Sequence, residues 1–480
     1  MFTQLTLRNF KAWRERIEIP LAPVTVLLGT NSSGKSSLLQ ALLLMKQTAL
    51  SPDRSIHLNF GGEDANDYFN FGDFEDVLTR GVKPRHFEIG FSLTSNSWRD
   101  ISGVYKRVNG EFNASYGITS HGVVVIQELK LGGANYYGRN ANIFELAGVS
   151  EDTPIHTIHL PISDLEAEVP VWEPSPENSN IFKVLRREKG AYSIYVDDES
   201  QSRGKSEEYS PERSIAFPPR AIYLLDRDAA LAEDISFAIR RELTSIAYLG
   251  PLRRKPERDY VWNKTKPGEL GTDGAGFVNA LFDSTFYRSK NGDPVEIVEE
   301  VSSWLARMGV AERLEARQVG RSSRYEIVVH KDGVVANLRD VGIGISQVLP
   351  VLTLAFFAQE GSTILMEEPE IHLHPLAQSV LAELFVEVSR KRRVQFIVET
   401  HSEHLFRRLQ TLVAKEELSL DDCRMYFVER QGADAVLKNL EPDEYGRVTR
   451  WPDKFFGDTL GETREQARLM FERQKRERQA

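Results

Sequence analysis

The chain has 480 residues, a formal net charge of −10 and a sequence pI near 5.7. This length allows about two to four domains, and the acidic balance argues against a surface coated with phosphate-binding charge. The single cysteine, Cys423, excludes an intrachain disulfide and indicates a reducing, cytoplasmic location. The longest late apolar run, Val348 to Ala358, is too short to span a bilayer, so we expect a buried helix and no membrane partner.

The first segment predicts two or three strands that lead into a phosphate-binding loop. The strand-like run Val24 to Leu28 precedes Gly29 to Ser36, which reads GTNSSGKS and fits the pattern GxxxxGK[ST]. A helix-like run from Ser37 to Lys46 follows. In that context the loop N–H groups can surround a polyphosphate, Lys35 can reach the β- and γ-phosphates, and the Ser36 hydroxyl can ligate Mg²⁺.

The middle of the chain predicts a β-rich insertion that becomes helical. Short strands such as 87–93 and 122–126 are separated by turn residues, and 197–214 is so polar that we expect a mobile loop. Helical periodicity returns over about 295–310, and 325–329 reads as a strand. Basic clusters occur at Arg240-Arg241, over 252–258 and at 391–393, and such runs are more often solvated faces than nucleic-acid sites.

A glycine-rich segment, Asn337 to Pro350, marks the return to a phosphate-type domain. Gly342 and Gly344 precede a helix-like run and can expose N–H groups at a helix N-terminus, while Ser346 and Gln347 add side-chain donors. This anion site has no phosphate of its own. Its natural partner is ATP on the P-loop of another subunit, which predicts a symmetric dimer with nucleotide at the interface. A plain glycine-rich helix start is the alternative.

The next segment, Thr363 to Glu370, is an apolar strand that ends in two adjacent carboxylates, which is the Walker B arrangement. Glu367 would hold Mg²⁺, and Glu368 would polarise the attacking water at the γ-phosphate. Aspartate is commoner at the first place, and Glu367 is one methylene longer. The alternative is a pair of surface acids beside a turn proline.

A second strand, 394–398, ends in Glu399-Thr400-His401-Ser402, which places His401 to sense a γ-phosphate. The spacings of His372, His374, His401 and His404 also resemble those of metal ligands. Pro375 and the P-loop context instead explain the first pair as loop structure.

The order of P-loop, long insertion, glycine-rich signature, EEPE Walker B and THS switch resembles the ABC-type ATPases of the SMC, RecF and OLD group, over residues 1–80 and 335–410. More narrowly, four segments look like a bacterial subfamily of stand-alone AAA-type ATPases. Some members serve in phage defence beside a separate nuclease, as in Septu-like systems with their PtuA-like ATPase subunit. The four segments are 248–253, 340–350, 366–375 and 451–456.

This resemblance implies an α/β P-loop NTPase fold of the ABC-ATPase type, with a mixed sheet flanked by helices and a large insertion between Walker A and the signature. The implied domains are an N-terminal lobe (1–86), the insertion (87–334), a C-terminal lobe (335–430) and an extension (431–480). The implied cofactors are ATP and Mg²⁺. The implied site residues are Gly29, Asn31, Gly34, Lys35, Ser36, Ser37, Gly342, Gly344, Ser346 and Gln347 for the nucleotide, Ser36 and Glu367 for Mg²⁺, and Glu368 with His401 for catalysis.

Three departures from the group limit what carries over. Gly342 stands where the wider group has serine, and Phe71 to Asp76 occupies the place of a Q-loop glutamine. Phe427-Val428-Glu429 resembles the first strand of a Toprim domain, but no DxD follows, so we predict no intrinsic nuclease. A membrane transporter subunit is the least favoured class, since nothing here would couple to a channel.

The sequence therefore favours a slow or partner-gated ATPase that forms a homodimer, or a higher even-numbered oligomer, and regulates a separate nuclease in antiphage defence. One alternative is a DNA-repair ATPase that binds duplex ends through Arg253 to Arg258. Another is a scaffold in which ATP is structural. The charged segment 459–480 is expected to be an exposed helix or docking arm.

Overall fold

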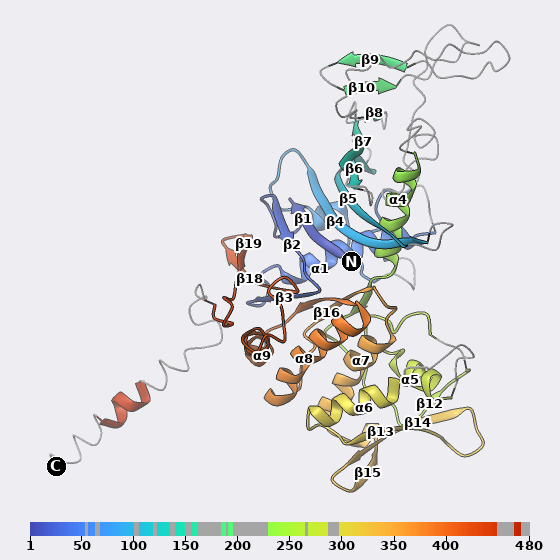
Figure 1. Ribbon diagram of the computed structural model, residues 1–480, viewed down its shortest axis with the longest axis vertical. Helices are drawn as coiled ribbons and strands as arrows, with labels where there is room; N and C mark the ends of the chain where they lie inside the picture. Colours follow the sequence, from blue (N-terminus) through green and yellow to red (C-terminus); the bar gives the residue numbers. More distant parts are fainter. Residues whose placement is uncertain are drawn as a thin grey trace.

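The structure is a computed structural model that describes residues 1–52, 56–62, 68–99, 105–118, 122–134, 140–148, 156–160, 184–188, 191–194, 229–264, 267–286, 297–448 and 465–471. A large antiparallel sheet lies on one side of a central mixed sheet, and a helical layer lies on the other (Figure 1). The mobile loop expected at 197–214 and the motif at 451–456 lie outside the described residues.

The central sheet has six strands in the order β11-β16-β17-β3-β18-β19. The first five strands run parallel, and β19 is antiparallel to β18. Because β18 pairs with the strand that precedes the P-loop, the stretch that resembled a Toprim strand belongs to the ATPase sheet. The strands are β11 (Ala247–Leu249), β16 (Thr363–Glu367), β17 (Gln395–Glu399), β3 (Val24–Gly29), β18 (Cys423–Gln431) and β19 (Asp434–Asn439).

This central sheet is buried on both faces, which explains why its strands are apolar throughout rather than alternating. Along β3, Val26 and Leu28 face one hydrophobic core, while Leu27 faces the other. Helix α1 (Lys35–Leu50) contributes to the core on the Leu27 side. Helices α7 (Ile343–Phe357), α8 (Pro375–Arg392) and α9 (Glu403–Ala414) contribute to the other core. Helix α7 contains the apolar run predicted to be a buried helix.

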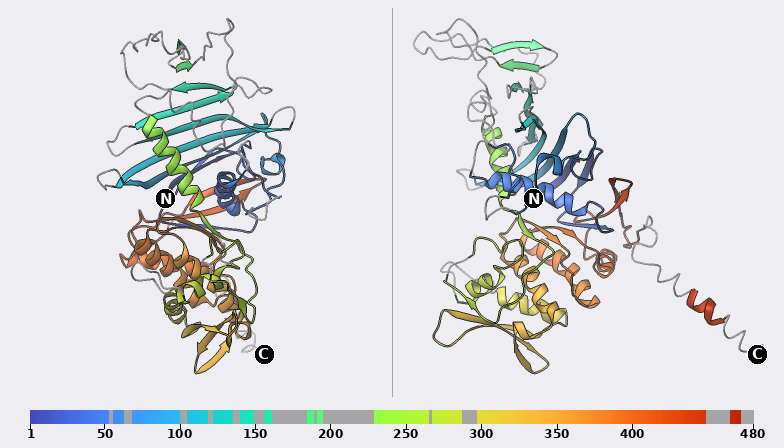
Figure 2. Two further views of the ribbon diagram at one scale, coloured as in Figure 1. Left: turned by 90° about the vertical axis from the view of Figure 1, so that its right-hand side faces the viewer. Right: turned by 180° about the vertical axis from the view of Figure 1, so that it is seen from behind.

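The second sheet is antiparallel and has nine strands in the order β2-β1-β4-β5-β6-β7-β8-β10-β9, with helix α4 (Ala229–Thr244) lying across it (Figure 2). Strand β4 pairs directly with β1, so the sheet crosses the domain boundary expected at residue 87. The strands are β1 (Phe2–Arg8), β2 (Ile17–Pro20), β4 (His86–Arg99), β5 (Tyr105–Ile118), β6 (Val124–Ala134), β7 (Asn140–Gly148), β8 (His156–Leu160), β9 (Val184–Glu188) and β10 (Ala191–Ile194).

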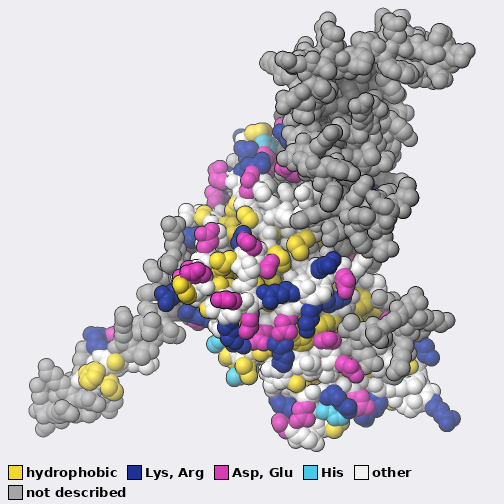
Figure 3. All heavy atoms as spheres, in the orientation of Figure 1, with side chains coloured by type: hydrophobic (Ala, Val, Ile, Leu, Met, Phe, Trp, Pro, Cys, Tyr) yellow, Lys and Arg dark blue, Asp and Glu magenta, His cyan; other side chains and the backbone are white. Residues whose placement is uncertain are grey.

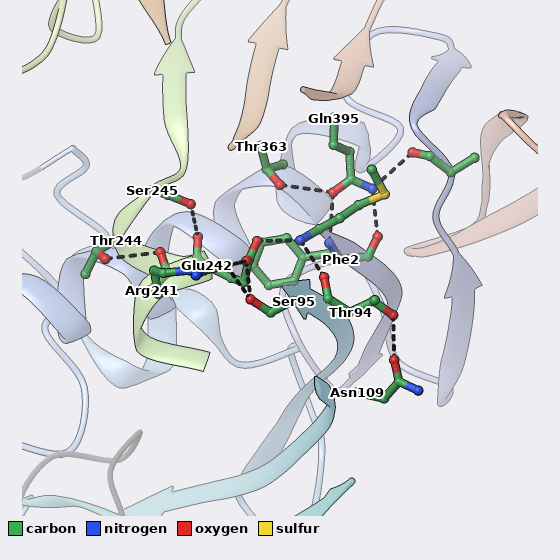
Figure 4. A network of polar contacts seen from close by, with 12 residues as sticks. Phe2, Thr94, Ser95, Asn109, Arg241, Glu242, Thr244, Ser245, Thr363 and Gln395 are labelled. Atoms are coloured by element: carbon green, nitrogen blue, oxygen red, sulfur yellow. Dashed lines mark hydrogen bonds and ion pairs between the residues drawn. The ribbon is translucent and has the colours of Figure 1, made fainter. Parts of the chain in front are cut away.

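The buried amide of Gln395 joins the two sheets (Figure 4). Its nitrogen donates to the carbonyl oxygens of Phe2 at 2.7 Å and Ala22 at 3.0 Å. Its oxygen accepts from the Phe2 N–H at 2.9 Å and from the Thr363 hydroxyl at 3.0 Å. These four hydrogen bonds satisfy the buried amide and fix β1 against the starts of β16 and β17.

The helical layer completes the fold and carries a small sheet in which β12, β13 and β15 all pair with β14. Its elements are β12 (Tyr260–Val261), α5 (Phe277–Phe286), α6 (Ile297–Arg307), β13 (Arg313–Gln318), β14 (Arg324–Lys331), β15 (Val334–Asn337) and a short 3₁₀ helix, η2 (Leu338–Asp340). Elsewhere, α2 spans Phe74–Val77, and a helix over 465–471 exposes Leu469, Met470 and Phe471. Among the described residues, no helix combines the length and apolar character needed to cross a bilayer.

Candidate nucleotide-binding site

The strand order brings the predicted motifs together at one edge of the central sheet. Strand β17 lies between β16 and β3, and the register pairs Glu367 with Glu399 and Glu399 with Leu27. The P-loop, the Walker B acids and His401 therefore leave the carboxyl ends of three neighbouring parallel strands. Ligands bind at such edges in open α/β sheets.

The P-loop conformation requires glycine at two positions. At Gly29 a Cβ atom would lie 2.2 Å from the carbonyl oxygen of Val428, and φ is +155°. Gly34 precedes α1 with φ of 110°, and the Trp13 indole donates to its carbonyl oxygen at 3.2 Å. Asn31 lies at the exposed tip of the loop, and Ser37 lies in the first turn of α1. This turn directs backbone N–H groups toward a phosphate position at the helix start.

The Lys35 side chain is buried at the centre of this edge, with 2% of it exposed. Its ammonium donates to the carbonyl oxygens of Gly29 at 3.1 Å and Thr30 at 2.9 Å. It also lies 3.5 Å from a carboxylate oxygen of Glu399. Burial lowers the pKa of Lys35, and the neighbouring carboxylates oppose that shift. The ammonium is therefore held where the P-loop and the acids meet.

Glu367 is a buried carboxylate beside the P-loop serine. The Tyr248 hydroxyl donates to its Oε1 at 2.9 Å, and the neighbouring Ser36 hydroxyl lowers the pKa of Glu367. Burial, and then the charge of Glu399, raise the pKa of Glu367 to about 7. A divalent cation would relieve the repulsion between two such carboxylates, and a hydroxyl with carboxylates is a donor set that Mg²⁺ accepts. The residues present therefore fit Mg²⁺.

Glu399 is a third acid that sequence reasoning passed over. It is 5% exposed, it lies against Lys35 and Ser36, and its Oε2 has no hydrogen-bond partner among the described residues. Burial raises its pKa, while hydrogen bonding to Ser36 and the charge of Lys35 lower it. An acid one residue before Thr400-His401 was the only sequence signal, and only the strand register gives it meaning.

Glu368 and His401 face each other in front of the P-loop. The Nε2 atom of His401 lies 3.8 Å from Oε1 of Glu368. Burial, and then the charge of Lys35, lower the pKa of His401, which favours its neutral form. Glu368 has φ of 44°, a left-handed conformation that is uncommon for a non-glycine residue and that recurs at functional sites.

The glycine-rich signature lies at the start of α7, with Gly342 as the N-cap. Gly342 is exposed and Ile343 is 54% exposed, so the backbone of this turn faces outward. Gly344 packs closely, because a Cβ atom there would lie 2.9 Å from the carbonyl oxygen of His372. The segment therefore presents the Gly342 backbone and the Ile343 side chain to solvent.

Two polar side chains of the signature point inward. The Ser346 hydroxyl donates to the Ile343 carbonyl oxygen at 2.9 Å, and this side chain is buried. Gln347 is also buried. In this conformation helix packing turns both side chains inward, and their predicted role as donors to a partner's phosphate stays a prediction.

The basic strip from Arg253 to Arg258 is partly buried and partly paired, while Lys255 is exposed. Arg253 is buried, Arg254 pairs with Glu257 at 3.5 Å, and Arg258 forms two hydrogen bonds to Asp340. On the face shown in Figure 3, Lys and Arg are interspersed with Asp and Glu rather than gathered into one patch. These placements weaken the DNA-end-binding alternative.

The segment at the expected place of a Q-loop forms local structure instead. Asp73 and Asp76 make a reciprocal capping box at the start of α2, and Phe74 is buried. Nearby, the Lys11 ammonium lies 5.3 Å from the Phe71 ring centroid.

Among the histidines of the metal-like spacing, His374 is the N-cap of α8. Across the described residues, no group of three His, Cys, Asp or Glu side chains is arranged to hold a metal ion.

Sheet order and converging motifs define the class: the chain is an α/β P-loop ATPase. An AAA ATPase domain model matches residues 1–112, and an AAA domain model whose description names AbiEii toxin and a Type IV TA system matches residues 171–407. These two ATPase domain matches imply ATP binding. A model described as Protein of unknown function (DUF3696) matches residues 418–466. No curated protein matches the chain.

Solved structures with a similar chain path include three SMC head domains, each 12% identical to this chain and each matched over 92% of it. One is an SMC head bound to the C-terminal winged-helix domain of ScpA, with a TM-score of 0.43 and 97% of its chain covered. The SMC head from Thermotoga maritima has a TM-score of 0.36 and 99% covered. The head from Pyrococcus furiosus, bound to the C-terminal domain of ScpA, has 0.40 and 96%. With TM-scores this low, the class rests on the sheet order, the motifs and the family models.

Proposed function

We propose that this chain is a Mg²⁺-dependent ATPase that closes as a nucleotide-sandwich dimer and thereby regulates a partner effector, a nuclease, in antiphage defence. One observation carries the ATPase part. Lys35, Glu368 and His401 converge at the carboxyl ends of adjacent strands, with the acid and the imidazole 3.8 Å apart. This is the arrangement that in-line attack of water on a γ-phosphate requires.

Each group at this edge has a distinct task in the proposed reaction. The P-loop N–H groups and Lys35 bind the phosphate chain, and Glu368 orients the attacking water and accepts its proton. His401, held neutral, donates a hydrogen bond to the γ-phosphate. Ser36 and Glu367, with Glu399 beside them, would hold Mg²⁺, which would neutralise charge on the phosphate chain.

The dimer part rests on what the signature exposes. Gly342 and Ile343 face solvent at the N-terminus of the 15-residue helix α7, where unpaired N–H groups and the helix dipole favour an anion. In the proposed dimer, this turn meets the γ-phosphate held by a second copy. ATP then contributes binding energy only when two subunits close around it, and hydrolysis releases them.

The regulatory part rests on family likeness. The AAA domain model that matches residues 171–407 names a toxin of a Type IV TA system, and the motifs resemble ATPases that accompany defence nucleases. A chain whose closure depends on ATP is suited to hold an effector in one state and release it in another. Phage plating on cells that carry the native gene cluster, with wild type or Glu368→Gln, tests this part.

Steady-state ATP hydrolysis with Mg²⁺, measured together with the mass in solution with and without ATP, tests the ATPase and dimer parts. Glu368→Gln keeps the side-chain volume and removes the base, so kcat should fall by about 10²- to 10⁴-fold while ATP-driven dimers accumulate. Glu387→Gln on α8 is the matched control, because that acid pairs with Arg307 of α6 in the helical layer. If wild type and Glu368→Gln hydrolyse ATP equally, the proposal is wrong.

A further inference from the structure

Arg253 is a buried cation whose place in the fold the ATPase motifs do not explain. It follows β11 in the Tyr248 to Arg253 segment, and only 8% of it is exposed. A single nitrogen, Nη2, donates to the carbonyl oxygens of Glu367 at 3.1 Å and Glu368 at 3.0 Å. The guanidinium therefore grips the main chain at the point where the Walker B strand ends.

Burying this guanidinium costs desolvation free energy, which an apolar side chain that only fills the space would not cost. Its Nε and Nη1 atoms have no hydrogen-bond partner in the part of the chain that the structure describes. Burial lowers the pKa of Arg253 to about 10, and the charges of Glu370 and Glu368 oppose that shift. An apolar side chain would fill the same volume without this penalty, so the cation is better explained by what it holds.

The same turn is fixed from its other side by Glu370. This carboxylate is 7% exposed, and its Oε1 accepts from the His401 N–H at 2.7 Å. Arg253 thus holds the start of this turn by donating to the carbonyl oxygens of Glu367 and Glu368. At the end of the turn, Glu370 binds the main chain of His401, which follows β17.

Both peptide groups that flank Glu368 are held. Its N–H donates to the Glu399 carbonyl oxygen at 2.8 Å, and its own carbonyl oxygen accepts from Arg253. A glutamate with φ of 44° needs such support, because left-handed backbone is strained for a non-glycine residue. Without the support, the peptide would relax and carry the carboxylate away from His401.

We propose that Arg253 is a positioning residue for hydrolysis: it holds the Glu368 peptide in its left-handed conformation and so keeps the carboxylate in register with His401. This inference rests on the proposed ATPase function and assigns no contact between Arg253 and nucleotide. It replaces the sequence-based alternative that Arg253 contacts DNA, since a side chain this buried and doubly bonded to carbonyls is not presented to a duplex.

The test compares Arg253→Met and Arg253→Lys with wild type in kcat, KM, affinity for a fluorescent ATP analogue, and Tm. Arg253→Met should lower kcat by about 100-fold while KM and analogue affinity stay within about threefold, because the P-loop is untouched. Arg253→Lys should recover at least about tenfold of that loss, because one ammonium nitrogen can replace the single Nη2 that makes both bonds. Arg254→Met, at an exposed neighbour, is the control and should leave all four quantities unchanged.

The possible results distinguish a failure of the Arg253 positioning role from a failure of the proposed ATPase function. If wild type turns over ATP and Arg253→Met keeps its kcat, the positioning role is wrong while the ATPase stands. A purely structural role would lower Tm and analogue affinity together in Arg253→Met, and Lys would not selectively restore kcat; that result also overturns the inference. A wild-type protein without turnover removes both the proposed function and this role.

Discussion

The nucleotide side of the central sheet and the signature side of the molecule are built differently. At the P-loop edge the polar side chains are buried and point inward, with Lys35, Glu367 and Glu399 all below 10% exposed. At the signature the polar side chains Ser346 and Gln347 turn into the helix core, and the exposed groups are the Gly342 backbone and the Ile343 side chain.

In the proposed dimer, the P-loop edge is complete within one chain, and the signature lends its surface to a second copy. At the P-loop edge, the buried ammonium and the buried carboxylates are already held together within one chain, so this site is preorganised for a ligand. A helix start that shows only backbone and an apolar side chain is shaped like half of an interface. Variants at the P-loop edge and at the signature should each impair one of these regions and leave the other unchanged.

The largest effect is expected from Lys35→Ala. Removing the ammonium deletes a charge-assisted contact with the phosphates and leaves Glu399 without its cation, so ATP affinity should fall by more than about 100-fold. Equilibrium titration with a fluorescent ATP analogue measures this change. Lys415→Ala, at the exposed end of α9, is the control. Retained affinity in Lys35→Ala would show that the P-loop is not the nucleotide site.

A weaker and more selective effect is expected on the signature side. Ile343→Glu places a carboxylate beside the position where a partner's phosphates would lie, so ATP-driven association should weaken by about 10- to 100-fold. ATP affinity of the monomer and Tm should remain unchanged. Sedimentation with and without ATP checks the change, and Leu420→Glu, another exposed apolar position, is the comparison. Equal association of Ile343→Glu and wild type would place the interface elsewhere.

Glu399→Gln should sharpen the account of the nucleotide side. The change removes one of two buried carboxylates next to Ser36, so the Mg²⁺ concentration for half-maximal turnover should rise by about tenfold. The Glu368 and His401 pair remains, and kcat at saturating Mg²⁺ should change less. A Mg²⁺ titration of turnover distinguishes the two quantities. An unchanged Mg²⁺ requirement would limit Glu399 to anchoring Lys35.

The smallest effect is expected on stability at acid pH, at His57, which belongs neither to the P-loop edge nor to the signature. His57 is buried, burial lowers its pKa, and its Nδ1 accepts from the Ile126 N–H at 2.8 Å, which requires an unprotonated Nδ1. A depressed folded-state pKa gives stability that is present above about pH 6.5 and is lost as pH falls through the folded value. His57→Gln keeps an acceptor and removes the titration. Its Tm should therefore fall less than that of wild type between pH 7 and pH 5, by about 2 °C.

Local sequence was sufficient for the parts of the site that are contiguous in the chain. Gly29 to Ser36, the pair Glu367-Glu368 and His401 each sit directly after an apolar strand, and parallel strands deliver their ends to one edge whatever their order. The structure confirms the α/β P-loop fold on these motifs. The assigned roles of the individual residues stay predictions.

The parts that escaped the sequence depend on pairing across long separations. Glu399 gains meaning only from its register with Glu367, and Arg253 is buried only because β11 lies beside β16. Strand β4 pairs with β1, and nothing local in the sequence shows that pairing. Burial and strand pairing are tertiary properties, and a basic or alternating run alone does not carry them.

The Gln395 amide has a mechanical consequence for the molecule. It lies at the first residue of β17, and Glu399 at the last residue of the same strand touches Lys35. Sliding β17 along its axis must therefore either break the hydrogen bonds of Gln395 to Phe2 or pull β1 with it, and β1 is a strand of the nine-stranded sheet. Strand β17 therefore connects the phosphate-binding edge of the central sheet directly to β1 of the nine-stranded sheet.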